Sequence, residues 1–318
     1  MAKENRTSQE DRKRQYRRYY YIAGITILVE ADLPITDQTF APKFREFEVD
    51  RLGTDLITIR HHFHLPDLKA QDLGKEVLRR PPWVIYRKGG AWIYWPLAPD
   101  PVDPNSYAFA MFNQDHTRGR IFNNGEDAFR QGGLTSLVTF ATDQVLLARV
   151  LADRQGCFFH SSGAVLDGQG LLFVGHSEAG KSTTVKMLKG KAEILYDDRN
   201  IVRRWPEGFR VHGTWNHGEV PLVSSASAPL GAIFFLKKSR QNCLVPLDNV
   251  KEIVGKLIAC LIKPLATADW WEKILALAEI MVREIPCYEM QFDTSGEVVP
   301  LLEDLVQHQH NRAASKAS

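Results

Sequence analysis

The chain has 318 residues, of which 44% are hydrophobic and 25% charged, and its formal net charge is only +2. This composition is typical of a soluble globular protein with one large or two ordinary domains. A charge so close to neutral argues against a dedicated nucleic-acid binder, whose binding domain would be strongly basic. No stretch reaches the roughly 18 to 20 apolar residues of a membrane span, so no membrane partner is expected.

The amino-terminal segment and the cysteines indicate the cellular compartment in which the protein is expected. Residues 1–18 are polar and basic and lack the apolar core of a secretory signal. They predict a disordered tail, with an acidic partner for its arginines as the alternative. The cysteines Cys157, Cys243, Cys260 and Cys287 are scattered and form no CxxC pair. We expect reduced, mostly packed thiols and a cytoplasmic protein.

Residues 19–134 have the composition of a β domain. Stretches rich in aromatic and β-branched residues, separated by Gly, Pro or Asp, predict strands within 19–32, 56–65, 83–97 and 107–113. The segment RKGG at 87–90 joins two aromatic strands and predicts a hairpin turn. This part of the chain is therefore predicted to be a small, mainly antiparallel β domain.

A histidine cluster lies in this half of the chain. On a strand, His62 and His64 share one face, and His61 points to the other. Two imidazoles on one face are able to bind a metal, but the sequence offers no evident third ligand. Packing or surface roles are the expected alternative.

Residues 135–305 are predicted to be an α/β domain. Apolar residues at helical spacing over 135–156, ending at Gly156, predict a helix that links the two halves. Strands and helices then alternate, which is the pattern of nucleotide-binding domains. Strands are expected at 157–167, 170–175, 193–198, 231–236 and 287–293, and helices at 181–190, 249–265 and 268–285. Residues 306–318 are expected to be a disordered tail.

The segment GHSEAGKST at 175–183 fits the phosphate-binding pattern G-x-x-x-x-G-K-[ST]. An apolar strand precedes it and a helix follows, as a genuine phosphate loop requires. Lys181 would reach the β and γ phosphates of a nucleotide, and the Ser182 hydroxyl would ligate Mg²⁺. Glu178 would be strained if its φ were positive, and we expect it to face solvent or a cation. The predicted cofactor contacts are Gly175, His176, Ser177, Glu178, Ala179, Gly180, Lys181, Ser182 and Thr183.

The next predicted strand ends in Asp197 and Asp198. A strand that follows the phosphate-loop helix usually lies close to the phosphate-loop strand, so its carboxyl end brings both aspartates to the phosphate edge. One carboxylate can hold Mg²⁺ while the other takes a proton from an attacking hydroxyl. The alternative is a pair of aspartates that cap a turn. Transport ATPases and GTPases fit less well, because no LSGGQ-type segment and no NKxD motif is present.

Together these motifs resemble a known family, HPr kinase/phosphorylase, whose nucleotide-binding core is similar to phosphoenolpyruvate carboxykinase. The matching positions are His160, Asp167, Gly168, Gly170, Gly175, Ser177, Gly180, Lys181, Ser182, Asp197 and Asp198. Segments further along the chain, up to about residue 300, look like divergent HPr-kinase-like proteins found beside peptide-modification genes. The resemblance implies an α/β fold: a P-loop carboxyl-terminal domain of the HPr kinase and PEP carboxykinase type, preceded by the β domain.

The resemblance also implies roles for these residues. Lys181 would bind phosphates, Asp198 would act as base, and Ser182 and Asp197 would hold the metal, with the two aspartates open to exchange. His160 would lie near the transferred phosphoryl group, and a packed strand histidine is the alternative. Five residues of a glycine-flanked loop would line the acceptor side or be plain loop: His212, Thr214, Asn216, His217 and Glu219. For Arg203 and Arg204, a surface position is expected over a role in charge stabilisation.

The predicted function is an ATP- and Mg²⁺-dependent kinase that phosphorylates a hydroxyl, expected to be a serine of a peptide or small protein. Thr183 stands where HPr kinases commonly have an acidic residue, which argues against a second metal contact. The later glycine-rich signature of those enzymes is absent, which argues against HPr itself as the acceptor. Two alternatives stay open: a small-molecule kinase on the same core, and a nucleotide-binding regulatory module without catalysis. HPr kinases assemble as hexamers, which leaves a homo-oligomer open for this chain.

Overall fold

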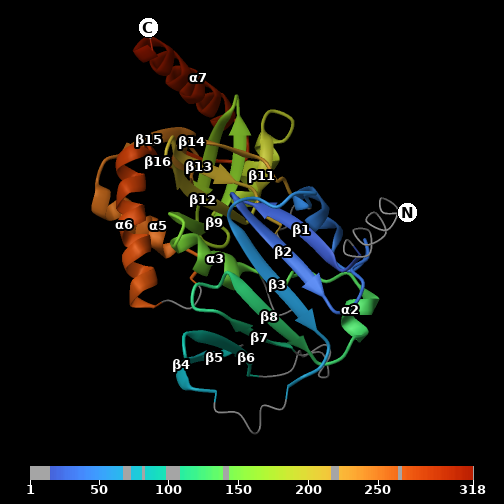
Figure 1. The fold of residues 1–318 in the computed structure, drawn as a ribbon. Coiled ribbons are helices and arrows are strands. Elements are labelled where there is room, and N and C mark those ends of the chain that lie inside the picture. The colour runs from blue at the N-terminus through green and yellow to red at the C-terminus, as the bar shows by residue number, and fades with distance from the viewer. Residues whose placement is uncertain are drawn as a thin grey trace. The chain divides into compact units, whose positions relative to one another are not determined.

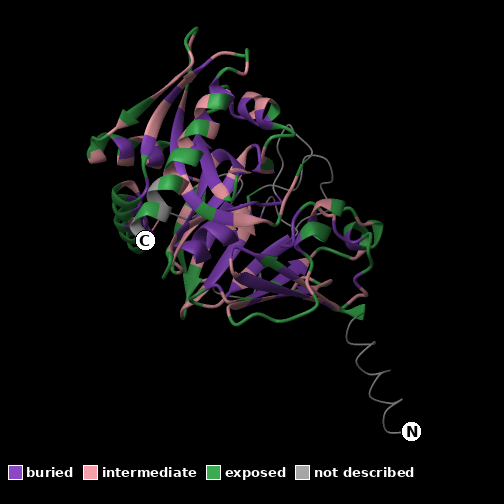
Figure 2. Cartoon of the chain, turned by 90° about the horizontal axis from the view of Figure 1, so that it is seen from above, coloured by how far each residue is buried: buried purple, intermediate pink, exposed green. Residues whose placement is uncertain are grey.

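The computed structural model describes residues 15–66, 73–80, 83–97, 108–138, 143–215, 222–263 and 267–317. The chain divides into two compact units, Met1–Leu146 and Leu147–Ser318, which can be followed by colour in Figure 1. In both units the strands are largely buried, whereas the helices expose one side (Figure 2). No helix in the described part of the chain has the length and hydropathy needed to span a bilayer.

The division between the units falls within helix α3 (Gln144–Ala152), further along the chain than the predicted boundary after residue 134. The helix predicted over 135–156 is too long, because α3 covers only Gln144–Ala152. Asp143 explains part of the difference, because one of its carboxylate oxygens accepts hydrogen bonds from the Leu137 N–H at 2.8 Å, the Val138 N–H at 3.2 Å and the Ser136 hydroxyl at 2.8 Å. These bonds hold residues 136–138 as a turn.

The first unit contains an eight-stranded sheet with the order β1-β2-β3-β8-β7-β6-β5-β4. Only the β2–β3 and β3–β8 pairs among these neighbours are parallel, so the sheet is mixed but mainly antiparallel, as predicted. Two short helices, η1 (Pro42–Phe47) and α2 (Asp127–Gln131), accompany it. The strands are β1 (Arg17–Ile22), β2 (Ile25–Ala31), β3 (Leu56–His62), β4 (Lys75–Arg80), β5 (Trp83–Lys88), β6 (Ala91–Pro96), β7 (Ala108–Phe112) and β8 (Arg118–Asn123).

Two predictions for this unit can be compared directly with the structure. The hairpin at RKGG is confirmed: Gly89 and Gly90 have φ of 53° and 82°, the two positive values that a tight hairpin turn needs. The prediction of a disordered tail over residues 1–18 is wrong at its carboxyl end. Strand β1 begins at Arg17, and Arg17 pairs with Glu30 of β2. Residues 1–14 lie outside the described residues.

His61 and His62 lie on opposite faces of β3, as predicted, whereas His64 lies in the bend beyond the end of that strand. His61 is fully buried, and its Nε2 donates to the Leu137 carbonyl at 2.8 Å. His62 points to the other face, where its Nδ1 lies 2.7 Å from Asp32 and its ring centroid lies 5.9 Å from that of His64. His62 also stacks on Phe122, so its ring packs against the sheet.

The second unit contains a sheet whose main path is β10-β9-β12-β13-β14-β16-β15. β11 pairs with β9, and β10 also pairs with β14 in parallel. The strands are β9 (Gly156–Leu166), β10 (Gln169–Val174), β11 (Glu193–Tyr196), β12 (Arg199–Trp205), β13 (Gly208–His212), β14 (Ser227–Lys238), β15 (Cys243–Leu247) and β16 (Cys287–Phe292). The predicted strands and helices of this half are present, and the sequence missed β12, β13 and β15.

Two hydrophobic clusters make up the core of this unit. One packs residues of β9, β12, β13 and β14 against helices α5 (Val250–Ala259) and α6 (Ala268–Glu284). The other packs β10, β14 and β16 against helices α4 (Lys181–Leu188) and α7 (Val298–Ala317). Cys157, Cys260 and Cys287 are buried and Cys243 is half-buried, all as free thiols, which confirms the prediction of mostly packed cysteines.

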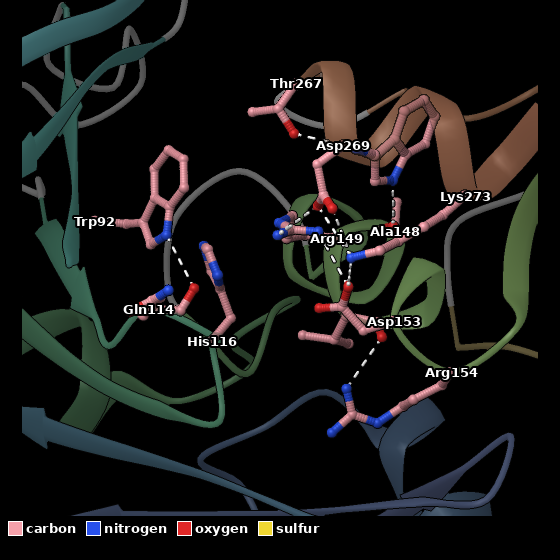
Figure 3. A network of polar contacts seen from close by, with 12 residues as sticks. Trp92, Gln114, His116, Ala148, Arg149, Asp153, Arg154, Thr267, Asp269 and Lys273 are labelled. Atoms are coloured by element: carbon pink, nitrogen blue, oxygen red, sulfur yellow. Dashed lines mark hydrogen bonds and ion pairs between the residues drawn. The ribbon is translucent and has the colours of Figure 1, made fainter.

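Polar contacts fasten α3 to α6 (Figure 3). The indole N–H of Trp270 donates to the Ala148 carbonyl at 3.0 Å. Lys273 on α6 lies 2.8 Å from both Asp153 and Asp269, and the buried Arg149 lies 3.6 Å from each of the same two carboxylates. This network holds the first helix of the unit against the helix that covers the sheet.

Helix α7 corrects the prediction of a disordered tail over 306–318. It runs to Ala317 and is the red helix at the carboxyl terminus in Figure 1. Val298, Val299, Leu302 and Val306 form its buried stripe and belong to the second core cluster. The apolar stripe ends at Val306, so periodicity could not reveal the polar turns that continue the helix beyond it.

Candidate functional site

The predicted phosphate-binding segment joins β10 to α4. Residues Leu171 to Val174 of β10 are buried, and residues 175–180 form the loop between the carboxyl end of this strand and the first turn of the helix. His176, Ser177 and Glu178 of the loop are exposed. Glu178 has a φ of 65° and faces solvent, so both the strain and the orientation expected for it are present.

Gly180 gives this loop its entry into the helix. Its φ is 105°, and a Cβ at this position would lie 2.6 Å from Cζ of Phe292. Only glycine meets both conditions, because other residues are strained at positive φ and the Phe292 ring belongs to the packed core. The loop is therefore held between the start of α4 and β16.

Replacing Gly180 with alanine should lower the free energy of unfolding of the second unit by about 2–4 kcal/mol, because backbone strain adds to an overpacked contact with Phe292. Gly190→Ala is the matched control: its φ is 83°, but nothing lies within 4 Å of the added Cβ, so it should lose only about 1–2 kcal/mol. Urea unfolding of the three proteins measures the difference. Equal losses would show that the contact with Phe292 costs nothing.

Lys181 lies across the loop. It is 7% exposed, and its Nζ donates to the Gly175 carbonyl at 3.1 Å and to the His176 carbonyl at 2.8 Å. The ammonium group is therefore held at the amino end of α4, where free backbone N–H groups and the helix dipole also favour an anion. Further along the same turn, Thr184 fastens the helix start through a 3.0 Å bond from its hydroxyl to the Gly180 carbonyl.

Ser182 and Asp197 come together at the start of the same helix. The Ser182 hydroxyl donates to Oδ2 of Asp197 at 3.3 Å, and Asp197 is only 2% exposed. Asp197 lies in the two-residue connection between β11 and β12. The structure thus brings Asp197, one of the two predicted aspartates, next to Ser182 at the start of α4.

Asp198, the other residue of this connection, points to β9. Its Oδ1 lies 2.9 Å from Nε2 of His160, and its Oδ2 forms an ion pair with Nε of Arg199 at 3.2 Å. Burial raises the pKa of Asp198, but the hydrogen bond from His160 and the charges of Arg199, His160 and Lys181 outweigh it and hold that pKa below its usual value. Asp198 is therefore a carboxylate at neutral pH.

His160 connects this carboxylate to the loop. Its Nδ1 lies 3.1 Å from the Gly175 carbonyl oxygen, while its Nε2 faces Asp198. A carbonyl and a carboxylate both only accept hydrogen bonds, so the ring makes both bonds only when it carries a proton on each nitrogen. In that form His160 places a positive charge between the loop and Asp198.

The other predicted site residues that the structure describes make contacts with other partners. His212 is buried at the end of β13, and the buried Thr214 donates to the Arg199 carbonyl at 2.8 Å. Asn216, His217 and Glu219 lie outside the described residues. Arg203 stacks over the Trp205 ring at 4.2 Å, and Arg204 pairs with Glu284 at 2.8 Å. The arginine that pairs with Asp198 is instead Arg199, which directly follows the two aspartates in the sequence.

Magnesium would find a suitable set of ligands in this site. Among the described residues, no group of three His, Cys, Asp or Glu side chains could hold a metal ion by itself. Mg²⁺ bound with a nucleotide needs no such group, because it usually takes one or two protein ligands and completes its shell with phosphate oxygens and water. The hydroxyl of Ser182 and the carboxylate of Asp197 fit that arrangement.

Comparison with known proteins places the chain in a family. No curated protein matches the sequence. The solved structure of the Hpr(Ser) kinase/phosphatase from Coxiella burnetii is similar over 49% of this chain and 98% of that chain, with 14% identity and a TM-score of 0.30, a level of likeness that carries no functional argument. The family model described as SynChlorMet cassette protein ScmC matches residues 135–307. Because that match covers more than half of the sequence, the chain belongs to the ScmC family.

Proposed function

We propose that this ScmC-family protein is an ATP- and Mg²⁺-dependent phosphotransferase that phosphorylates a hydroxyl group. The observation that carries the proposal is the meeting of three elements: Lys181 across the loop, the Ser182–Asp197 pair beside it, and Asp198 held by His160. Phosphoryl transfer needs a cation on the transferred phosphate, a metal-side carboxylate and a second carboxylate for the acceptor proton. The site offers one residue for each task.

In this mechanism the γ-phosphate lies against the loop and the start of α4. Lys181 turns from the loop carbonyls to the phosphate oxygens and, with the helix N–H groups, stabilises the charge that develops during transfer. Ser182 and Asp197 would hold Mg²⁺, which would supply charge neutralisation on the phosphate oxygens.

Asp198 accepts the proton of the attacking hydroxyl as the new O–P bond forms. The bond from the γ-phosphorus to the bridging oxygen breaks, and ADP leaves with its electron pair. The side chains of Asp198 and His160 are 21% and 26% exposed, so an acceptor can approach this pair from solvent. The sequence resemblance to HPr kinases supports a serine of a peptide or small protein as the acceptor.

Measuring ATP consumption with a panel of serine peptides, small proteins and small-molecule alcohols tests this function. Asp197→Asn and Asp198→Asn are each expected to lower phosphoryl transfer by at least about 100-fold. Asp304→Asn, on the exposed side of α7, is the matched control and should behave as wild type.

The outcomes separate the alternatives. Transfer only to small alcohols would favour a small-molecule kinase. ATP binding without any modified acceptor would favour a regulatory module. Full transfer by both aspartate variants would contradict the catalytic roles of Asp197 and Asp198, because neither carboxylate would then be required.

A further inference from the structure

Asp197 and Asp198 interrupt what is otherwise one continuous strand along β9. Tyr196, the last residue of β11, lies opposite Gly163, and Arg199, the first residue of β12, lies opposite His160. Both strands advance by three residues between these two pairs, so the pairing register is kept across the interruption. The Ser161 N–H still donates to the Asp198 carbonyl at 2.9 Å.

Asp197 and Asp198 form a bend between the two strands. At this bend the carboxylate of Asp197 points to Ser182 and that of Asp198 points to His160. The two halves of the proposed active site therefore depend on the backbone of just two consecutive residues. A small rotation of that backbone would move both carboxylates at once.

The side chain of Asn200 is hydrogen-bonded to the backbone of β9 and to the backbone that precedes this bend. It is fully buried, and its Nδ2 donates to the Ser161 carbonyl at 2.8 Å and to the Tyr196 carbonyl at 3.3 Å. Tyr196 directly precedes the aspartate pair, and Ser161 directly follows His160. One amide group thus connects the strand that carries the aspartates to the strand that carries the histidine.

The Asn200 amide contributes to this arrangement through its N–H donors and not through its oxygen. None of the described residues donates to its buried Oδ1. Such an oxygen destabilises the fold, a cost that an apolar side chain of similar size would avoid. Gly163 leaves the room for it, because a Cβ there would lie 2.7 Å from Oδ1.

We propose that Asn200 is a positioning residue that sets the Ser182–Asp197 and Asp198–His160 pairs relative to each other. This inference rests on the proposed function, since it assigns Asn200 a task in the same site. It adds a residue that touches neither nucleotide nor acceptor and acts through the backbone of its neighbours. Metal affinity is therefore a direct readout, because Ser182 and Asp197 must face the same ion.

The test measures Mn²⁺ binding to the ATP-loaded full chain by electron paramagnetic resonance, and ATP binding in EDTA by calorimetry. Asn200→Asp keeps the shape of the side chain but removes its donors, and Asn200→Ala removes them without adding a buried charge. Both should weaken Mn²⁺ binding by about 10- to 100-fold, as expected for the loss of a residue that orients metal ligands. ATP binding in EDTA should change by less than about twofold, because Lys181 and the loop are untouched.

Two further variants separate positioning from general damage. Gly163→Ala pushes on the same amide from the neighbouring strand and should weaken Mn²⁺ binding in the same direction. Asn242→Ala removes an amide that donates to Asp293 at 3.0 Å elsewhere in the unit and should leave Mn²⁺ binding unchanged. Folding of every variant is checked by thermal unfolding.

Wild-type Mn²⁺ affinity in folded Asn200→Ala and Gly163→Ala would overturn the inference and make Asn200 a core residue only. A wild-type protein that binds neither ATP nor Mn²⁺ would instead contradict the proposed function. The two failures are therefore distinguishable.

Discussion

Replacing Lys181 with alanine is expected to weaken ATP binding by at least about 100-fold, which corresponds to roughly 2.7 kcal/mol. The ammonium group is held at the amino end of α4 by two loop carbonyls. Charge-assisted hydrogen bonds to a phosphate are each worth about 1.5–3 kcal/mol, and Lys181 can make more than one. Loss of the side chain therefore removes most of the specific attraction for the terminal phosphates.

The same helix offers a matched control. Lys186 is exposed on α4 and has the same charge, so Lys186→Ala changes the net charge equally without touching the loop. Calorimetric titration with ATP should give an affinity close to wild type for Lys186→Ala and almost no heat for Lys181→Ala. If Lys181→Ala binds ATP as wild type does, the loop is not a phosphate-binding loop, and the proposed function fails with it.

The parts of the site that the sequence predicted are those with a local signal. The glycines and lysine of the loop stand at fixed spacing between a strand and a helix, and both elements have clear periodicity. Asp197 and Asp198 end a short apolar run, which placed them at a strand end without knowledge of the sheet. The opposite orientation of His61 and His62 likewise followed from alternation along one strand.

Other features of the site depend on pairing between distant segments and could not be predicted in this way. Asn200 looks like an ordinary polar residue near a strand start, and only the register of β12 on β9 brings its amide to Ser161. The ion pair of Arg199 with Asp198 depends on the same register. The buried Asn200 is also invisible to hydrophobic patterning, which treats an asparagine as exposed.

Acidification should destabilise both units, and this is the second effect we expect to be large. Burial lowers the pKa of His61 to about 4, with the charge of His62 adding to it and the hydrogen bond to Leu137 opposing it. Burial likewise lowers the pKa of His212 to about 3, aided by the charges of Arg210 and Arg203. Both rings are therefore neutral in the folded protein at pH 7 and take up a proton only far below the ordinary histidine range.

The direction of the effect follows from which state binds the proton. Unfolding returns each ring to a pKa of about 6.5, so below that pH the unfolded chain binds protons that the folded chain refuses. Stability is complete above pH 6.5 and falls as the pH drops toward the folded-state values. By pH 4.5, two pH units below the unfolded pKa, each histidine should cost roughly 2–3 kcal/mol.

Urea unfolding of the full chain between pH 7 and pH 4.5, resolved into its transitions, measures these losses. His61→Gln should reduce the pH dependence of the first unit and His212→Leu that of the second, because each variant removes a buried ring that resists protonation. His64→Gln is the matched control, since His64 is exposed in the bend that follows β3. Each buried histidine belongs to a different unit, so its substitution should change only one transition. An unchanged pH dependence in both variants would mean that carboxylates rather than these buried rings govern acid unfolding.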